Sequence, residues 1–198
     1  YSEKEVVDSL EEYSNIISWS KKSDQDIIEL LYQDNIVSVF GGRDECGKRA
    51  LGCRSILFSP LNKEIKQRLN EKTKNRDNKR PFAPSILREE VPNYFEKDIE
   101  SPYMSFVLNW KDEVKDKIPA CDHFGTGRLQ TVRQEDNEWY YNFIKLWKDK
   151  TGVPVIGNTS LNNSTPICSR PQDALDCFVG CDMDYLYFYD YGILVEKK

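Results

Sequence analysis

The sequence lacks any apolar stretch approaching the roughly 20 residues that a membrane-spanning helix needs. Its first residues also lack the apolar segment of a secretion signal. Hydrophobic residues make up 39% and charged residues 31%, a mixture typical of a globular protein. We therefore expect a cytoplasmic protein with no membrane partner.

Histidine is nearly absent, since His123 is the only one, and none of the six cysteines forms a CxxC pair. Metal sites and disulfide frameworks need closer groups of such residues. We therefore predict buried free thiols and no metal site in this chain. The cysteines are Cys46, Cys53, Cys121, Cys168, Cys177 and Cys181.

The net charge of −5 argues against a general nucleic-acid-binding protein. The charge is unevenly distributed, however. Between Arg43 and Arg80, twelve Lys or Arg stand against five Asp or Glu, a balance of +7, so the rest of the chain carries −12. A compact anion is the expected partner of this segment, although Lys63, Lys66 and Lys72 fit a solvated helix face equally well.

The 198 residues suffice for one core of ordinary size, and hydrophobic periodicity predicts helices and strands along the whole chain. Ser2 begins a helix whose apolar spacing continues to Ile17, and Ser23 begins a second helix. Residues 1–35 form a helical lead-in, either an arm toward a neighbour or a part that packs on the sheet. Further helices are expected at about 61–73, 136–150 and 171–178, and strands at 36–40, 81–87, 103–108, 128–132, 153–156 and 185–195.

Strands and helices therefore mix along residues 1–198 without a repeat, a low-complexity linker or a clear boundary. This pattern predicts a single α/β domain with a twisted mixed sheet flanked by helices. Residues 157–160 are expected to form a polar turn after a buried strand.

Two basic segments are the first candidates for a ligand site. Residues 41–55 place four glycines among three arginines and a lysine directly after a buried strand, so the backbone and the cations can approach a phosphate closely. Residues 74–85 lead from a cluster of cations into a rigid Pro-Phe-Ala-Pro stretch. Arg80 enters the core there and needs an anionic partner, either a ligand or an internal carboxylate.

Two further segments are weaker alone. Arg128 begins a strand after a turn of small residues, and residues 158–162 place Asn and Ser side chains beyond the end of a buried strand, where α/β proteins bind ligands. Guanidinium groups bind phosphate oxygens in pairs, and a lysine adds a mobile charge. The four segments together predict a site for phosphate compounds, and we find no convincing catalytic triad that includes His123.

The order of these motifs resembles the C-terminal domain of the nodulation and antibiotic O-carbamoyltransferases. The motifs read GR-x-E-x-G-x-RALG-x-RSIL, a lysine segment ending in RPFAPS, GT-x-R-x-QTV, TGVPV-x-x-NTS-x-N and P-x-DAL-x-CF, from about Ile36 onward. The resemblance implies a fold similar to the YrdC-like nucleotide-binding domains. It also implies hydrolysis of carbamoyl phosphate to carbamate, which attacks ATP, carried with Mg²⁺, to give carbamoyl-adenylate and pyrophosphate.

In that family a separate Kae1-like N-terminal domain, absent from this sequence, binds a metal and transfers the carbamoyl group to a hydroxyl acceptor. The resemblance implies that Lys74, Arg80 and Ser160 are the catalytic residues. The substrate- and nucleotide-binding residues that it implies, the last three of which serve equally well as structural hydrogen bonders, are Arg49, Arg128, Asn162, Arg43, Arg54 and Asn158.

The sequence departs from the family at several positions. Lys48 and Cys53 replace the usual proline and asparagine, Asp77 replaces a glutamate, and residues 164–166 replace Gly-Glu-Pro. His123 is out of step with the family histidine and is given no role. Two alternatives stay open: a threonylcarbamoyl-adenylate synthase, and a non-catalytic nucleotide- or RNA-binding module, of which the acidic total charge weakens the RNA version.

Overall fold

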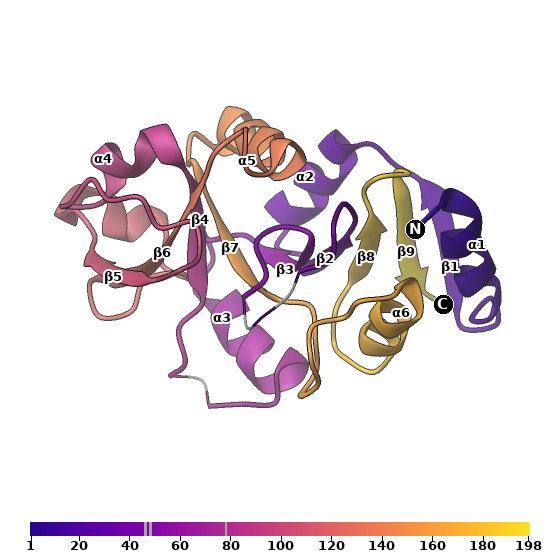
Figure 1. The fold of residues 1–198 in the computed structure, drawn as a ribbon. Helices are drawn as coiled ribbons and strands as arrows, with labels where there is room; N and C mark the ends of the chain where they lie inside the picture. Colours follow the sequence, from indigo (N-terminus) through magenta and orange to yellow (C-terminus); the bar gives the residue numbers. More distant parts are fainter. Residues whose placement is uncertain (46, 48, 78) are drawn as a thin grey trace.

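The computed structural model describes residues 1–45, 47, 49–77 and 79–198. Within these ranges one mixed sheet runs in the order β1-β9-β8-β2-β3-β7-β4-β6-β5 (Figure 1). The predicted α/β fold with a mixed sheet is confirmed. The strands are β1 Ile17–Lys21, β2 Val37–Phe40, β3 Arg54–Phe58, β4 Ala83–Leu87, β5 Phe106–Asn109, β6 Thr126–Val132, β7 Val155–Ser160, β8 Tyr185–Phe188 and β9 Ile193–Lys197.

The first two helices begin where the sequence signals predict. Ser2 and Ser23 each form a capping box, with Glu5 and Asp26 three residues later. The predicted helix at 61–73 is a short α-helix that continues as a π-helix. The α-helices are α1 Glu3–Glu11, α2 Asp24–Tyr32, α3 Glu64–Arg68, α4 Val91–Tyr94, α5 Glu138–Thr151 and α6 Pro171–Val179, and the other helical turns are η1 Leu69–Thr73, η2 Arg88–Glu90 and η3 Asp112–Lys117.

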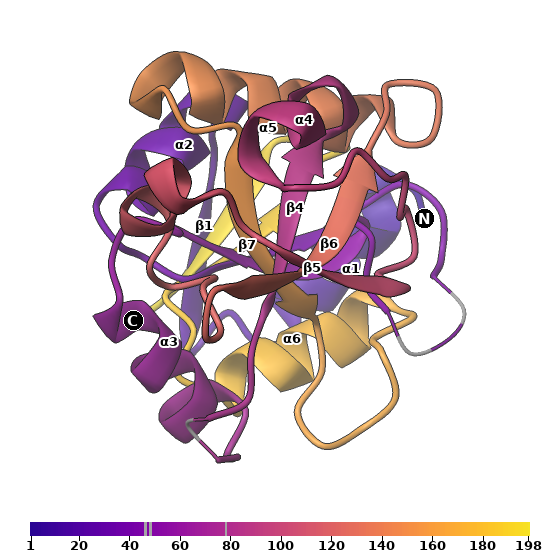
Figure 2. The ribbon, with the colours of Figure 1, turned by 90° about the vertical axis from the view of Figure 1, so that its left-hand side faces the viewer.

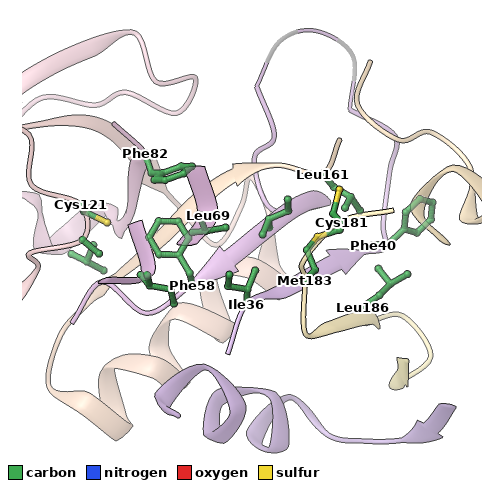
Figure 3. Close-up of a cluster of buried hydrophobic side chains, with 14 of the residues drawn as sticks. Ile36, Phe40, Phe58, Leu69, Phe82, Cys121, Leu161, Cys181, Met183 and Leu186 are labelled. Carbon is green, nitrogen blue, oxygen red and sulfur yellow. The ribbon is translucent and has the colours of Figure 1, made fainter. Parts of the chain in front are cut away.

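Helices cover both faces of the sheet. Helices α2 and α5 lie together on one face, where Phe143 and Trp147 are buried against strand residues such as Ile156. Helices α1 and α6 pack against each other on the opposite face. The larger apolar cluster lies on this side and includes Phe58, Phe82, Leu69 and Leu186 (Figure 3). The sheet is therefore buried on both faces along most of its width.

The N-terminal segment is built into this arrangement. Strand β1 pairs antiparallel with β9, Ile17 facing Lys197, and Val6 and Leu10 of α1 are buried in the larger cluster. The first helix ends at Glu11 rather than continuing to Ile17, so that part of the prediction is wrong. The apolar residues that fit helical spacing also fit a turn followed by a strand, and pairing with β9 decides between the two.

Two other predicted elements differ from the structure. The expected polar turn at 157–160 is strand, because β7 pairs with β3 on one side and β4 on the other through residue Ser160. Gly157 is required there for packing, since a Cβ would lie 2.2 Å from the Phe58 ring. The expected strand at 185–195 is the hairpin of β8 and β9, which turns at Gly192 with φ +60°.

The topology brings several chain ends to one edge of the sheet. Strands β4 and β6 run parallel, and β7 runs antiparallel to β4, so the carboxyl end of β7 lies beside the amino ends of β4 and β6 (Figure 2). Each of these ends carries a predicted site residue. No helix of the described residues is long and apolar enough to cross a membrane.

Candidate functional site

A cleft of about 150 Å³ opens where these strand ends meet. Its walls come from the segment before β3, the segment between η1 and β4, the start of β6 and the end of β7. Five of the predicted site residues line it, together with one arginine that the sequence analysis did not select. The lining residues are Arg49, Ala50, Arg76, Arg80, Pro81, Phe82, Ala83, Met104, Arg128, Asn158, Thr159 and Ser160.

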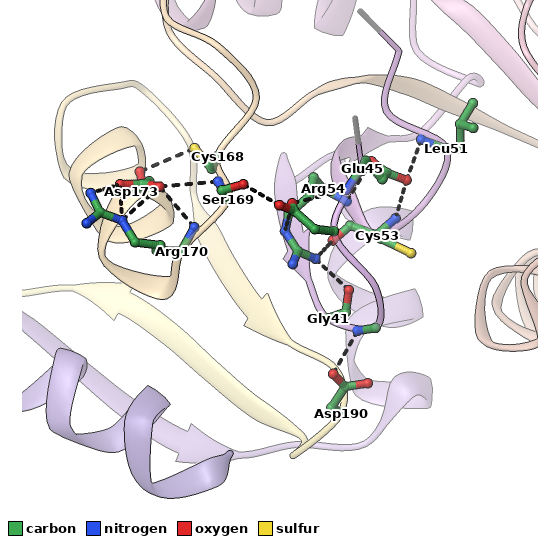
Figure 4. A network of polar contacts seen from close by, with 12 residues as sticks. Gly41, Glu45, Leu51, Cys53, Arg54, Cys168, Ser169, Arg170, Asp173 and Asp190 are labelled. Atoms are coloured by element: carbon green, nitrogen blue, oxygen red, sulfur yellow. Dashed lines mark hydrogen bonds and ion pairs between the residues drawn. The ribbon is translucent and has the colours of Figure 1, made fainter. Parts of the chain in front are cut away.

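The first wall is held by the half-buried carboxylate of Glu45. Glu45 accepts hydrogen bonds from the backbone N–H groups of Leu51, Cys53 and Arg54, at 2.8, 3.0 and 3.1 Å (Figure 4). A carboxylate with three backbone donors pins the segment that ends in β3. Arg49 is exposed at the rim of this segment, and its neighbour Ala50 is buried. Glu45 therefore fixes the backbone that carries Arg49; Cys46 and Lys48 lie outside the described residues.

Arg54, another predicted binding residue, lies away from the cleft. Its side chain is 1% exposed, Nη1 donates to the carbonyl oxygens of Gly41 and Cys53 at 2.6 and 2.9 Å, and the guanidinium carbon lies 3.7 Å from the centroid of Phe40 (Figure 4). These contacts favour the structural alternative for Arg54. Arg43 is exposed beside a different pocket, which Leu51 and Cys53 also line.

The second wall follows the π-helix η1. After η1 ends, Asn75 takes a left-handed conformation with φ 45°, which Asn tolerates better than most residues, and so turns the chain between Lys74 and Arg76. Arg76 lines the cleft, whereas Lys74 does not. Arg76 belongs to the cationic segment of residues 74–85 but was not among the predicted site residues. Its position two residues after Lys74, in the same cationic segment as Arg80, was the signal that could have found it.

The cleft carries a concentrated positive charge. Arg49, Arg76, Arg80 and Arg128 all line it, and no carboxylate of the described residues does. Among the described residues, Arg76, Arg80 and Arg128 form no ion pair with an acidic side chain. Arg76 donates through Nε to Oδ1 of Asn70 at 2.7 Å, and Arg80, which was expected to enter the core, is exposed at the cleft. An anion is the partner that such an arrangement accommodates.

Burial and the crowding of positive charge in the cleft lower the pKa values of two of its arginines. Burial, and then the neighbouring charge of Arg80, lower the pKa of Arg76 to about 10. Burial also lowers the pKa of Arg128, with contributions from Arg49 and Arg80. Both guanidinium groups remain cationic near neutral pH, so the repulsion persists until an anion enters.

Lys74 lies beside the carboxyl end of β7 and does not line the cleft itself. Its ammonium group donates to the carbonyl oxygen of Ser160, and to the backbone oxygen and Oδ1 of Asn162, both at 2.8 Å. The Ser160 hydroxyl donates to the same Oδ1 at 2.7 Å. The sequence-predicted trio of Lys74, Ser160 and Asn162 is therefore one connected group, and it reaches the arginine cleft through Ser160. Burial lowers the pKa of Lys74 to about 8.

Asn158 lies at the floor of the cleft. It is 1% exposed, and its Nδ2 donates to the carbonyl oxygen of Ala50 at 2.9 Å and to Oε1 of Gln130 at 2.7 Å. Ser85 donates to the same Gln130 oxygen. A buried chain of polar groups thus ties the first wall to strands β4, β6 and β7.

The cysteines of the described residues are free thiols; Cys121, Cys168, Cys177 and Cys181 are buried, whereas Cys53, which was also expected to be buried, is half-buried. In the part of the chain that the structure describes, no group of three His, Cys, Asp or Glu side chains is placed to hold a metal ion. The cleft itself offers arginines, a lysine nearby and neutral side chains, which suit phosphate oxygens rather than a cation.

The comparison with known families decides what kind of domain carries this cleft. Residues 28–197 match the family model described as Carbamoyltransferase C-terminus. The chain belongs to this carbamoyltransferase C-terminal family. The match covers nearly the whole sheet and every residue of the cleft.

Curated relatives agree with the assignment. The chain is 41% identical over 162 residues to nodulation protein NolO of Bradyrhizobium diazoefficiens, covering 79% of this chain and 29% of the relative. It is 40% identical over 162 residues to nodulation protein NolNO of Sinorhizobium fredii, covering 79% and 24%. An uncharacterized protein of Methanocaldococcus jannaschii is 37% identical over 172 residues, covering 86% and 28%. The chain thus spans between about a quarter and a third of the length of these relatives.

Two solved structures share the fold at low sequence identity. Full-length HypF in the phosphate- and nucleotide-bound form has a TM-score of 0.56 at 18% identity, covering 92% of this chain and 22% of that one. Sua5 of P. abyssi complexed with L-threonine has a TM-score of 0.58 at 15% identity, covering 82% and 45%. The expected YrdC-like fold is therefore confirmed.

Proposed function

We propose that this domain forms carbamoyl-adenylate from carbamoyl phosphate and ATP. Water first cleaves carbamoyl phosphate to carbamate and inorganic phosphate. A carbamate oxygen then attacks the α-phosphorus of ATP, and pyrophosphate leaves with the bonding electron pair. The observation that carries the proposal is the cleft that four arginines line, with no carboxylate among its described residues, and its connection through Ser160 to Lys74.

Both steps of this reaction depend on positioning and charge neutralisation rather than on a protein nucleophile. Arg76, Arg80 and Arg128 would hold the phosphate oxygens of the acyl phosphate and later of the nucleotide. Arg49 would close the cleft from its rim. Mg²⁺ would enter as part of the nucleotide substrate, and no protein ligand for it is needed.

Lys74 and Ser160 would act beside the transferring group. In the structure the Lys74 ammonium is bound to carbonyl and amide oxygens of residues 160–162. An entering phosphate oxygen would compete with these neutral acceptors as a charged one, which forms the stronger hydrogen bond. Lys74 would thereby hold charge that develops during cleavage, and the Ser160 hydroxyl would orient a phosphate or carbamoyl oxygen.

The carbamoyl-adenylate would pass to a Kae1-like transfer domain, which would deliver the carbamoyl group to a hydroxyl acceptor. The length of the relatives supports such a partner, because the chain covers only 24% to 29% of the two nodulation proteins. The match of residues 28–197 to the family model described as Carbamoyltransferase C-terminus is further support for a carbamoyltransferase role.

Pyrophosphate release tests the proposal. The purified chain is supplied with ATP, Mg²⁺ and carbamoyl phosphate, and carbamoyl-adenylate is identified by mass spectrometry. Product that disappears in Arg80→Ala and Lys74→Ala supports the proposal. Arg88→Ala is the matched control, because Arg88 follows the opposite end of β4 and is paired with Asp98 at 2.6 Å; it should retain activity.

Two other outcomes point to the alternatives. Pyrophosphate released only when L-threonine and bicarbonate replace carbamoyl phosphate would indicate a threonylcarbamoyl-adenylate synthase. Tight ATP binding without pyrophosphate release from any of these substrates would indicate a non-catalytic nucleotide-binding module and would contradict the proposal.

A further inference from the structure

The orientation of the Asn158 side chain is fixed by its neighbours. One of the two groups that face Nδ2 is the backbone carbonyl oxygen of Ala50, which can only accept a hydrogen bond. The other is Oε1 of Gln130. Both hydrogens of the Asn158 amide are therefore used, and the nitrogen cannot exchange places with the oxygen without losing the bond to Ala50.

In the part of the chain that the structure describes, the remaining atom, Oδ1 of Asn158, has no hydrogen-bond donor. It is buried, and no described group donates to it. Buried acceptors without a partner are rare in folded proteins because they have lost their water and gained nothing in exchange. Since Asn158 lines the arginine cleft, a donor that arrives with a ligand is the partner this oxygen lacks.

The position of Asn158 indicates which part of a ligand this donor belongs to. The phosphate of an acyl phosphate is expected to lie among the arginines, which leaves the acyl group facing the floor of the cleft. Every polar hydrogen of a carbamoyl group is on its amino nitrogen. An acetyl group has nearly the same shape but carries a methyl group there, which donates nothing.

We propose that Asn158 is the specificity-determining residue that recognises the carbamoyl amino group, by accepting a hydrogen bond from it at Oδ1. The inference rests on the proposed function and extends it from phosphate binding to the choice of acyl group. Ala50 and Gln130 serve to hold the amide so that its oxygen, rather than its nitrogen, is left for the substrate.

The test compares carbamoyl phosphate with acetyl phosphate. Both substrates present the same phosphate to the arginines. The ratio of their kcat/KM values therefore reports how much the amino group contributes to substrate selection. Both values are measured by ATP-dependent pyrophosphate release. A site built to bind an N–H group rejects an analogue without one by large factors. The wild-type chain is expected to favour carbamoyl phosphate by on the order of a hundredfold or more.

Two substitutions at the same position separate recognition from folding. Asn158→Leu cannot accept a hydrogen bond and should lower the ratio about tenfold or more, chiefly by lowering the kcat/KM for carbamoyl phosphate. Asn158→Asp keeps the acceptor, so it should lower the kcat/KM of both substrates and preserve their ratio. Ser85→Ala is the control, since it removes a hydroxyl that hydrogen-bonds to Gln130 and not to Asn158, and its ratio should equal that of the wild type.

Failure of the inference is distinguishable from failure of the proposed function. A wild-type chain that uses both acyl phosphates within about threefold of each other overturns the inference and leaves the function standing, whether or not the variants fold. A wild-type ratio retained in Asn158→Leu overturns it too. If no pyrophosphate is released with either acyl phosphate, the proposed function fails and the inference falls with it.

Discussion

The guanidinium group of Arg76 lies over the ring of Phe82, with its carbon 4.7 Å from the ring centroid. Phe82 is buried and packs against Phe58, their ring centroids being 5.2 Å apart (Figure 3). The Nε of Arg76 also donates to Oδ1 of Asn70 at 2.7 Å. The ring and the amide together fix the plane of the guanidinium, which leaves its Nη atoms for a ligand.

We expect this fixed plane to matter for substrate binding. Arg76→Lys keeps the charge but loses the planar stack and the paired donors, so the KM for carbamoyl phosphate should rise about tenfold or more. Phe82→Leu keeps the arginine but loosens it, and a smaller rise is expected. Steady-state pyrophosphate release at saturating ATP measures both. Arg133→Lys, at an arginine paired with glutamates, is the control; equal KM values in all four proteins would show that Arg76 does not bind the substrate.

The half-buried Lys74 predicts a pH dependence of activity. Its pKa is lowered to about 8 by burial, so the ammonium form that binds phosphate is lost as the pH rises through about 8. The kcat/KM for carbamoyl phosphate, which reports the free protein, should therefore fall above this pH. Lys74→Met should be weakly active at every pH and should lack this decline. A decline that persists in Lys74→Met would assign it to another group.

The free energy of unfolding should increase as the pH rises above about 8, whereas the activity falls. Lys74 has a pKa near 10.5 when unfolded and about 8 when folded, so between these values the unfolded chain binds more protons. The contribution of this group to the free energy of unfolding therefore increases from pH 8 to pH 10.5, by about 1–3 kcal/mol. Urea unfolding of the wild type and of Lys74→Met at several pH values isolates it, because the difference between the two proteins cancels other titrations.

Local sequence signals predicted the elements that depend on local chemistry. The capping serines Ser2 and Ser23 mark the starts of α1 and α2, and the aromatic periodicity of residues 136–150 identifies α5. The errors arose where pairing between distant strands decides. Gly157 and Asn158 have turn propensities, yet two neighbouring strands hold them extended, and no local pattern reveals those neighbours.

The candidate site was predictable in part. Cations near phosphate-binding backbones led to Arg49, Arg80 and Arg128, which the fold brings into one cleft. The sequence left Arg54 open between a binding and a structural role, and its burial favours the structural one. The role of Gln130 beneath Asn158 was also invisible, since it depends on the pairing of strands that are distant in the sequence.

Residues 1–35 were expected either as an arm or as a part packed on the sheet, and the packing of α1 supports a prediction for stability. Leu10 is fully buried between α1 and the rest of the larger cluster. Leu10→Ala should lower the free energy of unfolding by about 2–5 kcal/mol, because it leaves a cavity in the core. Its exposed neighbour supplies the control Glu11→Ala, which should cost less than about 0.5 kcal/mol. Urea unfolding measures both, and equal stabilities would mean that the segment acts as an independent arm.

Substitutions of Arg54 and Arg128 distinguish a structural arginine from a substrate-binding one. The buried guanidinium of Arg54 donates to two carbonyl oxygens and stacks on Phe40, so Arg54→Met should leave those acceptors unpaired and lower the free energy of unfolding by about 2–4 kcal/mol. The KM for carbamoyl phosphate should change little under conditions in which the variant stays folded. Arg128→Met, at an exposed arginine of the cleft, should show the reverse pattern: a raised KM and nearly unchanged stability. If instead Arg54→Met raised the KM without a loss of stability, the guanidinium would have to leave its carbonyl partners when substrate binds, and the first wall of the cleft would have to rearrange with it.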